Sequence, residues 1–125
     1  MTVNIDGKEH EVRFGLKFVA ELDKKYDKSG QAGYATGISR AVPMLFIGDM
    51  QTLSDVLFLS FCSEKNPPSK NDVDNYVETV EDIDALLEGV LEELKKQNAT
   101  KIAYRKIEEL YMTVQKAQKK ELVNE

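Results

Sequence analysis

Histidine and cysteine are almost absent from this chain, whose 125 residues include only His10 and Cys62. A disulfide framework is therefore excluded, and so is a zinc site built from histidine and cysteine ligands. Long apolar runs are also missing, because the two longest, at 41–47 and 56–62, have about seven residues each, whereas a membrane span takes roughly twenty. We expect no secretory signal either, since the first residues lack a basic region followed by an apolar stretch.

Positive charge is in deficit, because 17 basic and 22 acidic residues give a formal net charge of −5 at pH 7. Such a field repels phosphate backbones and anionic lipid, so nucleic acid and membrane surfaces are disfavoured as partners. With 42% hydrophobic residues, 31% charged residues and only three prolines, the composition is typical of an ordinary globular protein with one core. The single cysteine agrees with a reducing cytoplasm.

A β-hairpin is predicted at residues 2–14, where apolar and polar residues alternate on both sides of Asp6-Gly7. A two-residue turn at this position places Val3 opposite His10. The side chains predicted to share one face of the hairpin are Val3, Ile5, His10 and Val12. Because an isolated hairpin is marginally stable in water, this face is expected to pack on the helices that follow.

Apolar residues at three- and four-residue spacing predict a series of helices after the hairpin. The expected segments are residues 14–27, a stretch ending before Gly48, residues 50–63, a short helix after Ser69, residues 83–96, and a last helix within 99–125. The helix at 50–63 is expected to be the most buried. The fold class predicted is mainly helical α+β, with the hairpin packed on about five or six short helices. Two parts are expected: one globular domain at 1–98, and a C-terminal amphipathic helix with a frayed tail at 99–125.

Capping residues locate several of these helix starts. Asp49 is expected to cap the helix at 50–63, and Ser69 with Asp72 three residues later fits a capping box. Thr79 and Asp82 repeat this pattern ahead of the helix that starts at residue 83.

Glycine and proline punctuate the region between the first and third predicted helices. Gly30, Gly33 and Gly37 invite interpretation as a phosphate-binding loop, but no Gly-Lys-Ser/Thr follows them and no strand precedes them, which favours a flexible interhelical loop. Pro43 lies inside the second helical stretch, so either a kink or a helix that begins only near Ala41 is expected.

Acidic residues crowd the segment 72–93 and invite interpretation as a calcium site. A calcium loop counted from Asp72 has Val77 where glycine is required, and one counted from Asp82 has Leu87 there. Helix capping and a solvated acidic face are therefore favoured, with an acidic surface that meets a basic partner as the alternative.

The remaining reactive side chains do not predict catalysis. His10 lies on the inward face of the hairpin and is interpreted as a packing residue, and Cys62 lies near the end of an apolar helix, where it is interpreted as buried and inert. Lys116, Lys119 and Lys120 resemble a solvated tail. We predict a protein without enzymatic activity, metal or cofactor.

The last helix carries a narrow apolar stripe with coiled-coil spacing. Its members recur every three or four residues and are Ala103, Ile107, Leu110, Val114 and Ala117. Two tyrosines flank the stripe, and the residues predicted to bind a partner are Tyr104, Ile107, Leu110, Tyr111 and Val114. Two heptads are too few to establish a coiled coil, so this helix either docks on its own domain or meets a partner.

The order and spacing of these elements carry a resemblance to a known family. The segments concerned are the hairpin Val3 to Lys8, the run Phe14-Gly15-Leu16-Lys17-Phe18, the run Glu21 to Tyr26, Gly48-Asp49 before Leu53, Asp55 and Val56, Pro68-Ser69 before Asp72-Val73-Asp74 and Tyr76, and the helix from Ile83 to Lys96. Over residues 2–98 the chain resembles the tail assembly chaperones of long-tailed bacteriophages and prophages of Gram-positive hosts.

This resemblance implies a small protein that acts in the host bacterial cytoplasm and is absent from the mature virion. Such chaperones bind the long helical tape measure protein and help recruit tail tube protein. An apolar helical surface is suited to covering aggregation-prone helical stripes of that kind. The alternative hypothesis is a structural or regulatory helical protein that forms a homodimer through its C-terminal helix.

Overall fold

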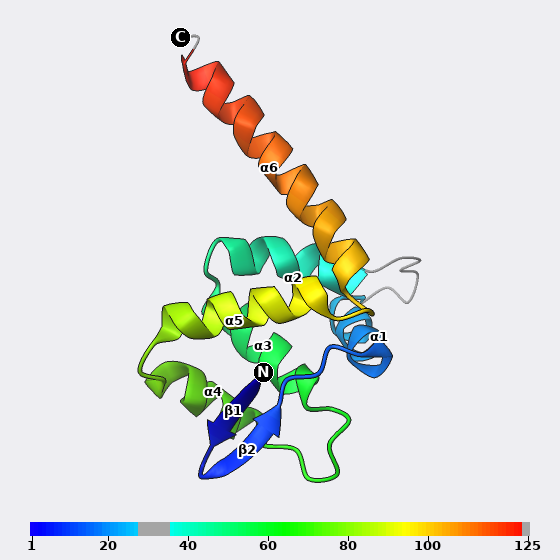
Figure 1. Cartoon of the computed structure of the whole chain (residues 1–125), viewed down its shortest axis with the longest axis vertical. Coiled ribbons are helices and arrows are strands. Elements are labelled where there is room, and N and C mark those ends of the chain that lie inside the picture. Colours follow the sequence, from blue (N-terminus) through cyan, green and yellow to red (C-terminus); the bar gives the residue numbers. More distant parts are fainter. Residues whose placement is uncertain (28–35, 124–125) are drawn as a thin grey trace.

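The computed structural model describes residues 1–27 and 36–123 of the chain. Over this part, a two-stranded antiparallel hairpin is followed by six helices (Figure 1). The elements are β1 (Thr2–Ile5), β2 (Lys8–Glu11), α1 (Leu16–Tyr26), α2 (Thr36–Phe46), α3 (Met50–Ser60), α4 (Lys70–Thr79), α5 (Ile83–Lys96) and α6 (Lys101–Val123). The predicted mainly helical α+β fold with an N-terminal hairpin is confirmed.

The hairpin has the predicted register, with Val3 paired to His10. Its turn residues Asp6 and Gly7 have φ values of 53° and 80°, the left-handed conformations that a two-residue turn of this kind requires. The four side chains predicted on one face are all buried: Val3, Ile5, His10 and Val12. Val3, Ile5 and Val12 join the hydrophobic core, and β1 contacts α4.

The start of α1 was predicted two residues too early, because Phe14 belongs to the connection after β2 and not to the helix. Gly15 separates them in an extended conformation (φ −92°, ψ −171°). Phe14 is completely buried, with its ring centroid 4.6 Å from that of Phe18, and its backbone N–H donates to Oε1 of Gln97 at 2.8 Å. A tertiary hydrogen bond thus satisfies the Phe14 N–H, which would have no acceptor within the helix even as its first residue.

Helix α2 begins at Thr36 and runs through Pro43, so of the two alternatives left open by Pro43 the late start near Ala41 is wrong. Proline removes a backbone donor from a helix interior. The apolar face of α2 offsets this cost, since Ile38, Val42 and Leu45 are buried almost completely.

Gly37 allows α1 and α2 to approach closely. A Cβ atom built on Gly37 would lie 2.7 Å from the backbone carbonyl carbon of Leu22 in α1. The backbone N–H of Gly37 donates to Oδ1 of Asp23 at 2.9 Å. This glycine therefore serves helix packing and not phosphate binding, whereas Gly30 and Gly33 lie outside the described residues.

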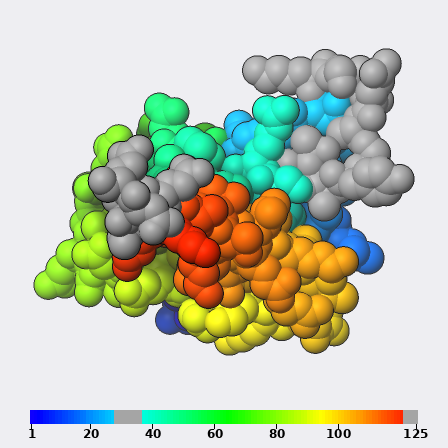
Figure 2. Space-filling model, turned by 90° about the horizontal axis from the view of Figure 1, so that it is seen from above, coloured from blue at the N-terminus to red at the C-terminus, as the bar shows by residue number. Residues whose placement is uncertain are grey.

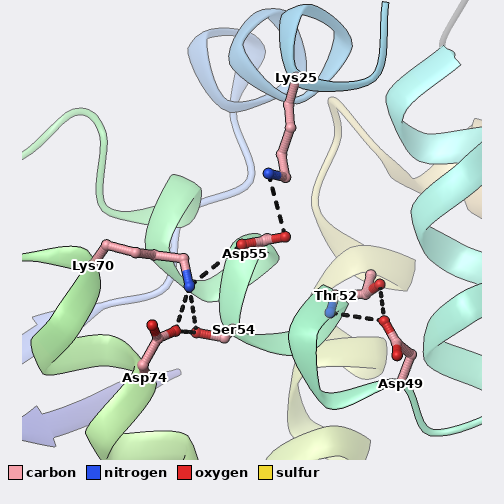
Figure 3. A network of polar contacts seen from close by, with 7 residues as sticks. All are labelled: Lys25, Asp49, Thr52, Ser54, Asp55, Lys70 and Asp74. Atoms are coloured by element: carbon pink, nitrogen blue, oxygen red, sulfur yellow. Dashed lines mark hydrogen bonds and ion pairs between the residues drawn. The ribbon is translucent and has the colours of Figure 1, made fainter.

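Helix α3 contacts α1, α2 and α4, and six of its eleven residues are buried. The Asp49 side chain caps it by accepting a hydrogen bond from the backbone N–H of Thr52 at 3.0 Å (Figure 3). Its helical hydrogen bonding ends at Ser60, three residues earlier than predicted, with Phe61 at the C-cap.

The caps of α4 and α5 show which side chains fix the helix starts. Ser69 accepts from the backbone N–H of Asp72, as predicted, and Asp82 accepts from that of Ala85, both at 3.0 Å. Thr79 was grouped with Asp82 as a capping residue, and this was wrong. It is the last residue of α4, and its hydroxyl donates to the carbonyl of Asn75 at 2.7 Å.

A polar network ties α3 to its neighbours at the protein surface (Figure 3). Asp55 of α3 lies 3.4 Å from Lys25 of α1 and 3.4 Å from Lys70 of α4. The Lys70 ammonium also contacts Asp74 and the Ser54 hydroxyl. Burial alone disfavours the charged ammonium, but these carboxylates hold the pKa of Lys70 above its usual value, and hydrogen bonds from Lys70 and Ser54 hold the pKa of Asp74 below its own.

A second network joins the end of α5 to the hairpin. The side-chain amide of Gln97 accepts from the Phe14 N–H, donates to the Val12 carbonyl at 3.2 Å and donates to Glu93 Oε2 at 2.7 Å. Burial acts against the charged form of Glu93, but hydrogen bonds from Lys96, Gln97 and the Met1 amino group hold its pKa below the usual value. This cluster fastens the end of α5 to both ends of the hairpin.

Candidate protein-binding surface

The base of α6 is anchored in the core. Thr100, directly before the helix, is fully buried and donates its hydroxyl to the Leu94 carbonyl at 2.7 Å. Tyr104 is only 4% exposed, and its ring packs edge-on against Phe46 of α2 at a centroid distance of 5.9 Å. Burial, together with the neighbouring Glu108 carboxylate, raises the pKa of Tyr104 to about 12. Its phenol is therefore uncharged at neutral pH.

Three of the five predicted partner-binding residues face the protein's own helices. Besides Tyr104, these are Ile107, which packs against the core, and Tyr111, whose ring lies 4.8 Å from that of Phe46. Seen from above, α6 lies between α2 and α5 (Figure 2), and it contacts both. The first turns of α6 therefore dock on the chain's own domain.

The other two predicted residues are exposed. Leu110 is 67% exposed and Val114 is 48% exposed. They lie four residues apart on one side of α6, in the part that projects away from the remainder of the protein (Figure 1). The apolar stripe read from the sequence is thus divided, with its first part buried against α2 and α5 and its second part open to solvent.

The projecting part of α6 differs in charge from the rest of the protein. Residues 110–120 contain three lysines and no acidic residue, and the lysines at 116, 119 and 120 are all exposed. This segment, which we call the arm, carries +3 in a chain whose net charge is −5. Met112, 51% exposed, lies on the opposite side of the arm from Leu110 and Val114, because two residues correspond to about 200° of helical rotation.

A second exposed apolar region lies where α2 meets α3. Met44, Ile47 and Met50 are exposed there, around the turn at Gly48, whose φ is +81°. Sequence periodicity did not single out these residues, because Met44 and Ile47 belong to the uninterrupted seven-residue apolar run at 41–47. The burial of Val42 and Leu45 in the same run shows that only one face of α2 points inward.

Met50 also lines a cavity of about 320 Å³ between α3 and α4. The other lining residues are Gln51, Ser54, Asp55, Lys70, Asp74, Val77 and Glu78. Three carboxylates face one ammonium group in this groove, and Met50 and Val77 supply its apolar surface. Within residues 1–27 and 36–123, Glu78 takes part in none of the ion pairs, so it is the most available of the three carboxylates.

The two side chains considered for catalysis, His10 and Cys62, lie partly or fully inside the protein. His10 is buried, its Nδ1 lies 2.7 Å from Glu64 Oε2, and its ring packs at 5.3 Å from that of Phe61. The interpretation of His10 as a packing residue is confirmed, although sequence periodicity could not find Glu64, 54 residues away. Cys62 was predicted to be buried. It lies just after α3 and is only half-buried.

The carboxylates of segment 72–93 include a helix cap and a member of a surface ion-pair network. Asp82 caps α5 and Asp74 joins the Lys70 network. Among the described residues, no group of three or more His, Cys, Asp or Glu side chains is placed to hold a metal ion.

Comparison with known families identifies this arrangement. The family model described as "Phage tail assembly chaperone protein, TAC" matches residues 2–109. The chain belongs to the phage tail assembly chaperone family. Neither a curated protein nor a solved structure matches it. The family read from the order of the hairpin and helices, that of the tail assembly chaperones, is thereby confirmed, and this family consists of non-catalytic chaperones that act on tail proteins.

The family match also divides the chaperone's surface. It includes the hairpin, the α3–α4 groove and the first turns of α6 with Tyr104 and Ile107, and it ends immediately before Leu110. The exposed part of the apolar stripe and the lysines of the arm lie beyond it. None of the helices in the described part of the chain is both long and apolar enough to cross a membrane.

Proposed function

We propose that this chaperone binds the tape measure protein of a phage tail in the host cytoplasm, covers apolar helical segments of it, and assists assembly of tail tube protein around it. In this proposal the chaperone leaves before the virion matures. Family membership supports a tail protein as the client. A long helical protein awaiting assembly exposes apolar stripes, and covering them requires apolar surface on the chaperone.

The observation that carries the proposal is the exposure of Leu110 and Val114 on the projecting arm. Residues at this spacing form one side of a helix, which suits a partner helix with apolar residues at the same spacing. Tyr104, Ile107 and Tyr111 have a different role in the proposal. They hold the base of α6 on α2 and α5, so that the arm is presented to the client in one orientation.

Co-expression with the neighbouring tape measure protein tests the proposal. We expect the chaperone to increase the soluble fraction of that protein and to co-purify with it. Leu110→Asp is expected to weaken the complex about tenfold or more, because burial of a leucine side chain is worth about 1.5–3 kcal/mol and the new carboxylate has to be desolvated. The fold should be unaffected, since exposed positions change stability by only about 0.5 kcal/mol.

Met112→Asp is the matched control, because it places the same charge on the opposite side of the arm. It should bind the client as the unmodified chain does. A tape measure protein that is neither solubilised nor co-purified would contradict the proposed function. Equal affinity of the Leu110→Asp and Met112→Asp variants would move the client-binding surface away from this face of the arm.

A further inference from the structure

The arm and the α3–α4 groove are complementary surfaces of the same chain. The arm offers Leu110 and Val114 on one side and contains three lysines and no carboxylate. Lys120 flanks the side that carries Leu110 and Val114, whereas Lys116 and Lys119 lie on the same side as Met112. The arm carries +3 and the whole chain −5, so the remainder of the chain carries −8. Any contact between the arm and the rest of a second molecule is therefore favoured by long-range electrostatics.

The groove supplies the features that the arm lacks. Met50 and Val77 give it apolar surface, and its three carboxylates, Asp55, Asp74 and Glu78, exceed the two ammonium groups that pair with them, those of Lys70 and Lys25. Its volume of about 320 Å³ is enough for one or two side chains. Asp55 and Asp74 are already paired within the chain, whereas Glu78 is exposed on the last turn of α4.

We propose that the arm of one copy docks in the α3–α4 groove of a second copy. Leu110 and Val114 would pack on Met50 and Val77, and Lys120, which lies about 100° from them around the helix, would face Glu78. Lys116 and Lys119 lie on the far side of the arm and would act on the second copy only at long range. The arm points away from its own body (Figure 1), so the contact forms between molecules. Because the two surfaces differ, the interface is head-to-tail, and it extends into a chain or closes into a ring.

The contact does not depend on the identity of the client. It uses the face of the arm that the proposed function assigns to client binding, so a second copy covers Leu110 and Val114 until a client helix displaces it. Self-association and client binding are measured in separate experiments. A negative result for one of them does not decide the result for the other.

Sedimentation velocity on the full chain over a range of concentrations tests the docking. The average mass of the unmodified chain should rise with concentration, and the rise should weaken at high salt because charge contributes to the contact. Leu110→Asp, which disables the arm, and Glu78→Lys, which disables the groove, should each weaken self-association about tenfold or more. Far-UV circular dichroism checks that the variants fold; Val114→Asp and Met50→Lys are the second variants for the two surfaces.

Mixing the two variants is the decisive experiment. Leu110→Asp retains an intact groove and Glu78→Lys retains an intact arm, so an equimolar mixture should form a one-to-one dimer that neither variant forms alone. Met112→Asp and Glu88→Lys are the controls, because they make the same charge changes at exposed positions on the other side of α6 and on α5. Both controls should associate like the unmodified chain.

Three results would overturn the proposal. One is a strict monomer at the highest soluble concentration. Another is full self-association of Glu78→Lys with loss in Leu110→Asp, which would indicate two arms pairing with each other in a symmetric dimer. The third is a mixture that remains monomeric. Co-purification of the tape measure protein with Glu78→Lys checks the proposed function independently, because that variant keeps the client-binding face intact.

Discussion

Two helical glycines should respond in opposite directions to the same substitution. At Gly37 a new Cβ would meet the Leu22 carbonyl carbon at 2.7 Å and its carbonyl oxygen at 2.8 Å. These are backbone atoms of α1, so relief requires the two helices to separate. At Gly89 in α5 the Cβ would meet the side-chain tip of Met1, with Cε at 2.8 Å and Sδ at 3.2 Å, and a flexible methionine side chain moves aside easily.

The magnitudes follow from this difference. Alanine is favoured over glycine within a helix by about 1 kcal/mol, whereas overpacking costs about 1–3 kcal/mol. In Gly37→Ala the overpacking cost is near its upper end and exceeds the gain from the alanine. The substitution should therefore destabilise the fold by about 1–2 kcal/mol. Gly89→Ala avoids most of it and should be neutral or stabilising by up to about 1 kcal/mol. For a chain of this length, 1 kcal/mol shifts the melting temperature by about 4 °C.

Thermal and urea denaturation followed by circular dichroism measure both changes. The two variants serve as controls for each other, since each adds one methyl group to a helix of the same chain. Equal shifts in the two variants would refute the reasoning, and so would a stabilised Gly37→Ala, because either result would mean that α1 and α2 are not held in contact through backbone atoms at this position.

Two further predictions concern the network at the end of α5. Gln97→Ala leaves the buried Phe14 N–H without its acceptor and should destabilise the fold by about 1–3 kcal/mol in urea denaturation. The control Gln115→Ala, on the exposed arm, should leave the free energy of unfolding unchanged. Equal effects of the two substitutions would contradict the role of Gln97. Glu93 has a lowered pKa, so its carboxylate stabilises the fold above its usual pKa of 4.5 and this contribution is lost as the pH falls below that value. Glu93→Gln should therefore be less stable than the unmodified chain at neutral pH, and the difference should shrink in acid; a constant difference across pH would exclude this linkage.

The local features of the fold were predictable because their causes are local. The pairing of Val3 with His10 follows from a two-residue turn at Asp6-Gly7, and the start of α4 follows from a serine placed where its oxygen reaches the N–H of Asp72. Hydrophobic periodicity then gave the order of the helices. The family resemblance rested on this order.

Two of the differences between prediction and structure have one physical origin, which is contact between residues far apart in the sequence. Phe14 continues the apolar spacing of α1, but Gln97, 83 residues away, binds its backbone N–H and holds it outside the helix. Pro43 suggested a late helix start, but the burial of the face around it in the core keeps α2 helical from Thr36.

The candidate binding surface shows the same division most clearly. From the sequence, the residues from Ala103 to Ala117 at three- and four-residue spacing form one apolar stripe flanked by Tyr104 and Tyr111, because spacing alone determines which side chains share a face of a helix. The tertiary structure decides how far along that stripe the protein's own core reaches: Phe46 covers Tyr104 and Tyr111, and Leu110 and Val114 stay in solvent. Periodicity sets the direction in which a side chain points, but only the packing of α2 against α6 determines whether another surface lies there to cover it.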